Sequence, residues 1–183
     1  MNKVHIFSII AAFLMLVCMV SAIDFTDWKQ TSVDESAFNS SSTVNFTVMV
    51  PPGYKVETVD SPIGPVTSFL NESDSSATTS IVIINNPIGQ KLNDKNSKKY
   101  LDGFMQGAKI TPIPGTEPQY LEDGGIVDYG TSGDGAGGVY ILSTDEKVII
   151  VSGFYKTIDD ATAGATNLAL IAATVEIKSS EPE

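Results

Sequence analysis

The sequence predicts an α+β fold, in which helices pack on a mostly antiparallel sheet of about six strands. Short segments with apolar or alternating residues recur between clusters of turn-forming residues. Consecutive strands are joined mostly by short turns, which is the connection that antiparallel neighbours allow. Two strands are apolar on both faces, and two other segments carry apolar residues at helical spacing. We therefore expect helices on both faces of the sheet, in an α/β/α sandwich.

The first 22 residues have the pattern of a secretory signal peptide. Lys3 precedes an apolar run of 15 residues from Ile6 to Val20, and the small residues Ser21 and Ala22 follow. A bilayer core needs about 20 residues, which favours a cleaved leader over a retained anchor helix. We predict that residues 1–22 are removed, that no stable membrane span remains, and that the protein is secreted or held at the cell surface.

The mature chain that this cleavage leaves is acidic and lacks several reactive side chains. It has 183 − 22 = 161 residues and a net charge of 10 − 22 = −12, which disfavours nucleic acid as a partner. His5 and Cys18 lie in the leader, and the sequence has no arginine. Serine and cysteine nucleophiles commonly need an imidazole base. We therefore predict that the protein is not an enzyme and binds no cofactor.

The first half of the mature chain is predicted to be mostly strands. Residues 23–43 form a polar lead-in rich in Ser and Thr, expected to be a tether with a short helical or extended piece around Trp28. Alternating apolar residues in 44–50 predict a strand that the following Pro-Pro-Gly ends. Further strands are expected at 54–59, 66–70 and 79–84.

The second half adds two helices and the remaining strands. Apolar residues at helical spacing predict a helix over 94–108, and strands are expected at 119–129, 138–142 and 147–155. Thr157 is a good N-cap for a final helix, and 179–183 is an acidic tail. The glycine-rich run 130–138 lacks the Lys-Ser or Lys-Thr of a phosphate-binding loop, so we expect a long hairpin loop there.

In this order of elements the chain resembles the PsbP-like and DcrB-like proteins, which are small exported or lumenal domains. The resemblance rests on the sequence FTVMVPPGY of residues 46–54 and on a last helix that follows a strand at 147–155. It covers about residues 44–178, the predicted domain. It implies a PsbP-like fold and an accessory, binding or assembly-assisting role rather than catalysis.

An acidic stretch from Glu117 to Asp134 is the other candidate for function. Asp128, Asp134, Glu122 and Asp123 offer hard oxygen ligands for calcium, although their spacing matches no EF-hand. Paired carboxylates also hydrolyse glycosidic bonds, but Trp28 is the sole tryptophan available to stack on a sugar. A solvated acidic loop is the simpler interpretation.

Three Asn-X-Ser/Thr sequons fit N-glycosylation of an exported chain. Asn39 and Asn71 lie in predicted loops, whereas Asn45 lies on the outward face of a predicted strand.

Two hypotheses for function follow. The favoured one is a non-catalytic exported accessory or binding domain whose partner is an envelope or surface protein. The alternative is a carboxylate-based calcium or carbohydrate-binding module, or a hydrolase, that uses the stretch from Glu117 to Asp134.

Overall fold

The computed structural model describes residues 25–35, 38, 44–72, 77–122, 124–133 and 135–178. The predicted leader and the acidic tail lie outside these residues.

The described residues form one large antiparallel sheet with the strand order β3-β4-β5-β10-β9-β8-β6, in which β7 also pairs with β8. The strands are β3 (Tyr54–Val59), β4 (Val66–Asn71), β5 (Ala77–Asn85), β6 (Thr111–Pro112), β7 (Gln119–Tyr120), β8 (Ile126–Ser132), β9 (Gly135–Ser143) and β10 (Lys147–Tyr155). This arrangement confirms the predicted α+β fold and its antiparallel sheet.

The centre of the sheet is formed by β5 and β10, which pair from Asn85↔Lys147 to Ala77↔Tyr155. Both strands have buried side chains on each face, as the apolar runs in the sequence predicted. Ile81, Ile83 and Val151 belong to one core cluster, whereas Val82 and Val148 belong to another on the opposite face. The sheet therefore separates two hydrophobic layers.

A second, three-stranded sheet has the order β1-β2-β11, formed by β1 (Lys29–Asp34), β2 (Asn45–Val50) and β11 (Glu176–Ile177). Its first strand comes from the predicted lead-in and pairs with β2 over six residues, from Lys29↔Val50 to Asp34↔Asn45. The packed domain therefore begins before residue 44, earlier than the resemblance indicated.

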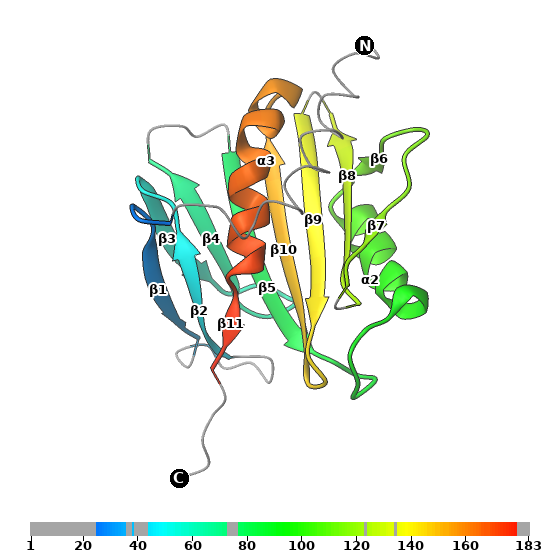
Figure 1. Cartoon of the computed structure of the whole chain (residues 1–183), viewed down its shortest axis with the longest axis horizontal. Helices are drawn as coiled ribbons and strands as arrows, with labels where there is room; N and C mark the ends of the chain where they lie inside the picture. The colour runs from blue at the N-terminus through cyan, green and yellow to red at the C-terminus, as the bar shows by residue number, and fades with distance from the viewer. Residues whose placement is uncertain are drawn as a thin grey trace.

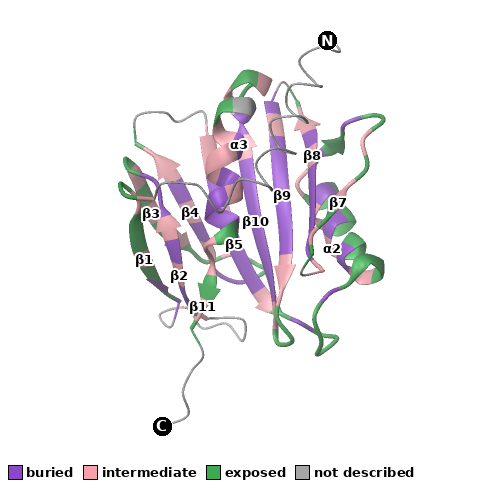
Figure 2. Ribbon diagram, in the orientation of Figure 1, coloured by how far each residue is buried: buried purple, intermediate pink, exposed green. Residues whose placement is uncertain are grey.

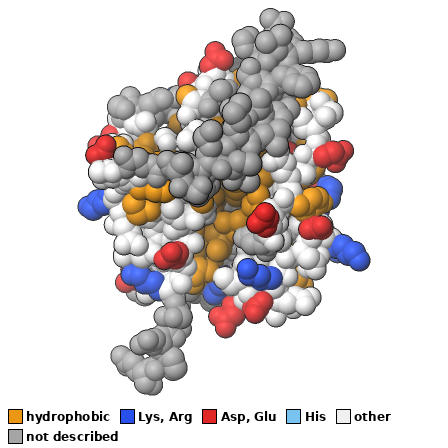
Figure 3. Space-filling model, in the orientation of Figure 1, with side chains coloured by type: hydrophobic (Ala, Val, Ile, Leu, Met, Phe, Trp, Pro, Cys, Tyr) orange, Lys and Arg blue, Asp and Glu red, His pale blue; other side chains and the backbone are white. Residues whose placement is uncertain are grey.

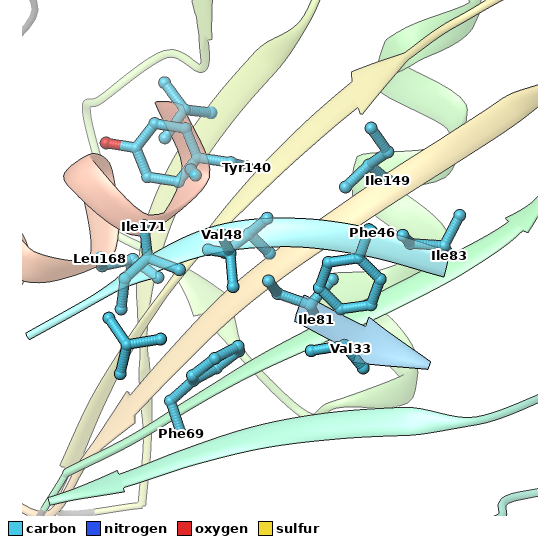
Figure 4. Packing of buried hydrophobic residues seen from close by; sticks show 14 of the residues in the cluster. Val33, Phe46, Val48, Phe69, Ile81, Ile83, Tyr140, Ile149, Leu168 and Ile171 are labelled. Carbon is cyan, nitrogen blue, oxygen red and sulfur yellow. The ribbon is translucent and has the colours of Figure 1, made fainter. Parts of the chain in front are cut away.

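The two helices in the described part of the chain lie on opposite faces of the large sheet (Figure 1). Helix α3 (Ile158–Ala173) packs beside the small sheet and contributes Leu168 and Ile171 to the core shared with Phe46 and Phe69 (Figure 4). Helix α2 (Asp94–Gly107) covers the other face, where Leu101 and other apolar side chains meet β8 and β9. This arrangement matches the predicted α/β/α sandwich, with a small sheet added to one outer layer.

The glycine-rich run 130–138 is not the long loop that we predicted. Gly130 lies in β8 and Gly135, Gly137 and Gly138 lie in β9, where most of the strand is buried (Figure 2). A Cβ on Gly130 would lie 2.4 Å from the Thr111 carbonyl oxygen, and one on Gly135 would lie 2.2 Å from that of Tyr155. These glycines permit close backbone approach within the sheet rather than a flexible turn.

Candidate functional site

Asp128 is the buried one of the two predicted calcium ligands that the structure describes. It lies in the middle of β8 opposite Val139, and only 7% of its surface is exposed. Strand alternation places it on the same face as Ile126, which packs in the core beneath α2. One carboxylate oxygen accepts a hydrogen bond of 2.7 Å from the Tyr129 backbone N–H.

The charges around Asp128 are mixed. Burial raises the pKa of its carboxyl group, and the neighbouring carboxylates of Asp102 and Glu117 act in the same direction. The Tyr129 N–H and the Lys98 ammonium act in the opposite direction. Lys98 is itself paired with Asp102 on the exposed side of α2, at 2.7 Å. This lysine therefore partly offsets the acidic character of the site.

One of the other predicted calcium ligands lies in a loop at one end of β8. Glu122 is exposed in the turn that joins β7 to β8, whereas Asp123 and Asp134 lie outside the described residues. Ser132 and Gly135, the strand residues that flank position 134 in the sequence, pair at the opposite end of β8. Within the described residues no three acidic, histidine or cysteine side chains gather as a metal site.

The calcium site therefore stays a prediction. Calorimetry with millimolar calcium tests it directly, because a filled oxygen site releases or absorbs heat and raises the melting temperature. The absence of both effects would exclude it.

Glu35 is a buried carboxylate that the sequence analysis did not identify. It follows β1, is fully buried, and accepts a 3.2 Å hydrogen bond from the Val44 backbone N–H through Oε2. Among the described residues, its Oε1 has no hydrogen-bond partner. Burial raises the pKa of Glu35, while the Val44 N–H and the Lys147 ammonium act to lower it. The sequence signal for its position was the alternation with buried Val33, two residues earlier.

Buried tyrosines lie between the large sheet and α3. The Tyr129 hydroxyl donates a 2.8 Å hydrogen bond to the Tyr140 hydroxyl, and the Tyr155 hydroxyl donates a 3.0 Å bond to the Gly164 carbonyl. Burial raises the pKa of Tyr140 to about 12 and those of Tyr129 and Tyr155 well above the usual value. All three are therefore protonated at neutral pH, which suits packing and hydrogen bonding rather than proton transfer.

The sequons differ in their surroundings. Asn45 is exposed at the start of β2, Asn71 is half-buried at the end of β4, and Asn39 lies outside the described residues. Glycosylation at any of the three remains a prediction.

Three exposed apolar side chains lie at the same end of the large sheet. Val59 and Ile63 lie in and beside the β3–β4 hairpin, and Ile88 lies in the loop after β5; they are 54%, 59% and 41% exposed. The pairs Val59↔Val66 and Val66↔Val82 place both loops at the same end of neighbouring strands. We call Val59, Ile63 and Ile88 the hairpin-end patch.

The charged side chains do not form a patch of one sign on the face that Figure 3 shows. Acidic and basic groups lie scattered over this face, with apolar side chains exposed between them. In the described part of the chain no helix is both long enough and apolar enough to cross a membrane.

Comparison with known proteins identifies the fold. No family model matches the chain, and no curated protein matches it. Among solved structures, cyanobacterial PsbP (CyanoP) from Synechocystis sp. PCC 6803 matches with a TM-score of 0.51 at 9% identity, over 86% of this chain and 96% of that one. LpqN of Mycobacterium tuberculosis, involved in cell envelope biogenesis, matches with a TM-score of 0.44 at 15% identity, over 83% of this chain and 92% of that one. This protein therefore has a PsbP-like fold, as the resemblance in its sequence predicted.

Proposed function

We propose that this protein is a non-catalytic accessory domain that acts outside the cytoplasm by binding another envelope or surface protein. The observation that carries the proposal is the set of side chains that the mature domain lacks. Removal of residues 1–22 leaves a chain with no imidazole, no thiol and no guanidinium group. The PsbP-like fold is compatible with such a role.

The buried polar groups support the same proposal. The Tyr129 and Tyr140 hydroxyls form a hydrogen bond between the neighbouring strands β8 and β9, and the Tyr155 hydroxyl hydrogen-bonds to the backbone of α3, which joins the large sheet to this helix. Glu35 accepts a backbone hydrogen bond just after the end of β1, and Asp128 accepts one in the middle of β8. Each of these contacts serves the packing of the fold.

The hairpin-end patch is the surface that we assign to the partner. Single exposed apolar residues are ordinary on protein surfaces, but neighbouring ones commonly mark a contact site. Ile63 is the most exposed of the large apolar side chains described, at 59%. A partner that covers the patch would remove it from water without any change in the fold.

Photo-cross-linking in the native host tests this proposal. A photoreactive amino acid is placed at Ile63, and separately at Asp159 as a matched control. Asp159 is also exposed but lies in the first turn of α3, at the opposite end of the large sheet. We expect one cross-linked envelope or surface protein from position 63 and none from position 159.

Two results would contradict the proposal. If position 63 gives no cross-linked protein, the hairpin-end patch is not the surface that contacts a partner. Equal products from positions 63 and 159 would show that the captured protein is only nearby.

A further inference from the structure

Strand β3 is an open edge of the large sheet (Figure 1). Its partner is β4, and the Glu72 N–H donates a 2.9 Å hydrogen bond to the Gly53 carbonyl just before the strand. Because hydrogen-bonded pairs alternate in an antiparallel ladder, the backbone groups of Tyr54, Val56 and Thr58 point away from β4. No described residue hydrogen-bonds to these outward backbone groups. An edge of this kind can pair with another strand.

The exposed side chains of β3 carry opposite charges. Lys55 and Glu57 project from the same face, with 58% and 44% of their side chains exposed, and they form an ion pair with each other. Tyr54, Val56 and Thr58 project from the other face and are half-buried. An exposed ion pair contributes little to the stability of a single chain. These two charges can therefore determine which strand pairs with the β3 edge.

The β3 strands of two copies of the chain can pair antiparallel through their outward backbone groups in three registers. Each register has its own two-fold axis, which passes through residue 55, 56 or 57. An axis at 55 places Lys55 opposite Lys55 of the second copy, and an axis at 57 places the two Glu57 side chains opposite each other. An axis at Val56 places each Lys55 opposite Glu57 of the second copy. Directly opposed residues interact strongly, so opposite charges stabilise this register and like charges disfavour the other two.

We propose that this protein forms a two-fold symmetric dimer through β3, with the axis at Val56. The two large sheets then continue across the interface, because Val56 pairs with its copy and Tyr54 pairs with Thr58 of the second copy. Val59 of the hairpin-end patch is the last residue of β3, but it lies outside the paired residues 54–58, so the dimer does not depend on the proposed partner.

The dimer is tested by charge reversal on the native protein. We expect sedimentation equilibrium to give a dimer for the natural sequence. Lys55→Glu and Glu57→Lys each place like charges opposite each other twice per dimer, and each should weaken dimerisation by at least about tenfold. The effect should decrease as the salt concentration rises, because exposed charges are screened.

Mixing the two single variants separates charge pairing from misfolding. A Lys55→Glu chain carries two acids on β3 and a Glu57→Lys chain carries two lysines, so a mixed dimer has every charge opposed by its complement. We expect the mixture, and the double variant Lys55→Glu/Glu57→Lys, to dimerise as tightly as the natural sequence. Lys98→Glu, which breaks the other exposed ion pair, on α2, is the matched control and should leave dimerisation unchanged.

Three results would overturn the proposal. A natural sequence that stays monomeric up to about 1 mM would exclude a dimer of useful affinity. Single variants that dimerise like the natural sequence would show that β3 is not the interface. A mixture that stays monomeric would show that the single variants lost dimerisation for another reason.

Discussion

At the scale of single residues, glycines provide the space in which the buried tyrosines pack. A Cβ on Gly164 of α3 would lie 2.1 Å from a ring carbon of Tyr155, and one on Gly138 would lie 2.4 Å from the Tyr129 ring. These contacts join residues from different elements. For this reason the sequence, which shows only local spacing, could not predict them.

Replacing a helical glycine should have opposite effects in the two helices. In an exposed helix, Gly→Ala stabilises by about 1 kcal/mol, and we expect this gain for Gly103→Ala in α2, where a Cβ would meet nothing within 4 Å. Gly164→Ala should instead destabilise by about 1–3 kcal/mol, because the methyl group overlaps the Tyr155 ring. Urea unfolding of both variants measures the difference, and a stabilised Gly164→Ala would contradict the packing described.

Glu35 should make stability depend on pH. Its pKa is raised in the folded state above the ordinary value of 4.5, so the folded state holds the proton more tightly than the unfolded state. Protonated Glu35 therefore contributes to stability when the pH is below its ordinary pKa. This contribution is lost as the pH rises through the pKa of Glu35 in the folded state. We expect the free energy of unfolding of the natural sequence, relative to Glu35→Gln, to fall as the pH rises from below the ordinary value of 4.5 to above it. A difference that stays constant over this range would show that Glu35 has an ordinary pKa.

At the scale of elements, local pattern located most helices and strands. The predicted helix at 94–108 is observed as Asp94–Gly107, and the predicted strands at 54–59 and 147–155 are observed with those bounds. The prediction was wrong for the glycine-rich run 130–138, because glycines in this run lie in strands and approach backbone atoms of neighbouring strands closely. Strand β1 was indicated only as an extended piece near Trp28, since most of its side chains are exposed and Val33 is its sole buried one.

The start of α3 offers a test of an element predicted from sequence. The Thr157 hydroxyl oxygen accepts a 3.1 Å hydrogen bond from the Asp160 N–H, as an N-cap does. We expect Thr157→Ala to lower the free energy of unfolding by about 1 kcal/mol and Thr157→Ser to retain most of it. Equal stability of the alanine and serine variants would show that the cap contributes nothing.

At the scale of the whole molecule, the sequence predicted the layers but not the surface that we assign to a partner. Apolar strands such as β5 and β10 require cover on both faces, and this requirement can be read along the chain. The hairpin-end patch depends on which loops the sheet brings to one end. The acidic stretch was conspicuous in sequence, yet Asp128 is buried under α2 while Glu122 is exposed.

The proposed function requires export and the removal of residues 1–22, which contain His5 and Cys18. The intact mass of the protein purified from outside the cytoplasm of its native host tests this point most directly. We predict a chain that begins at Ile23, with any added mass explained by glycans on the sequons. A mass that includes residues 1–22 would contradict the account, because His5 and Cys18 would then remain part of the working protein.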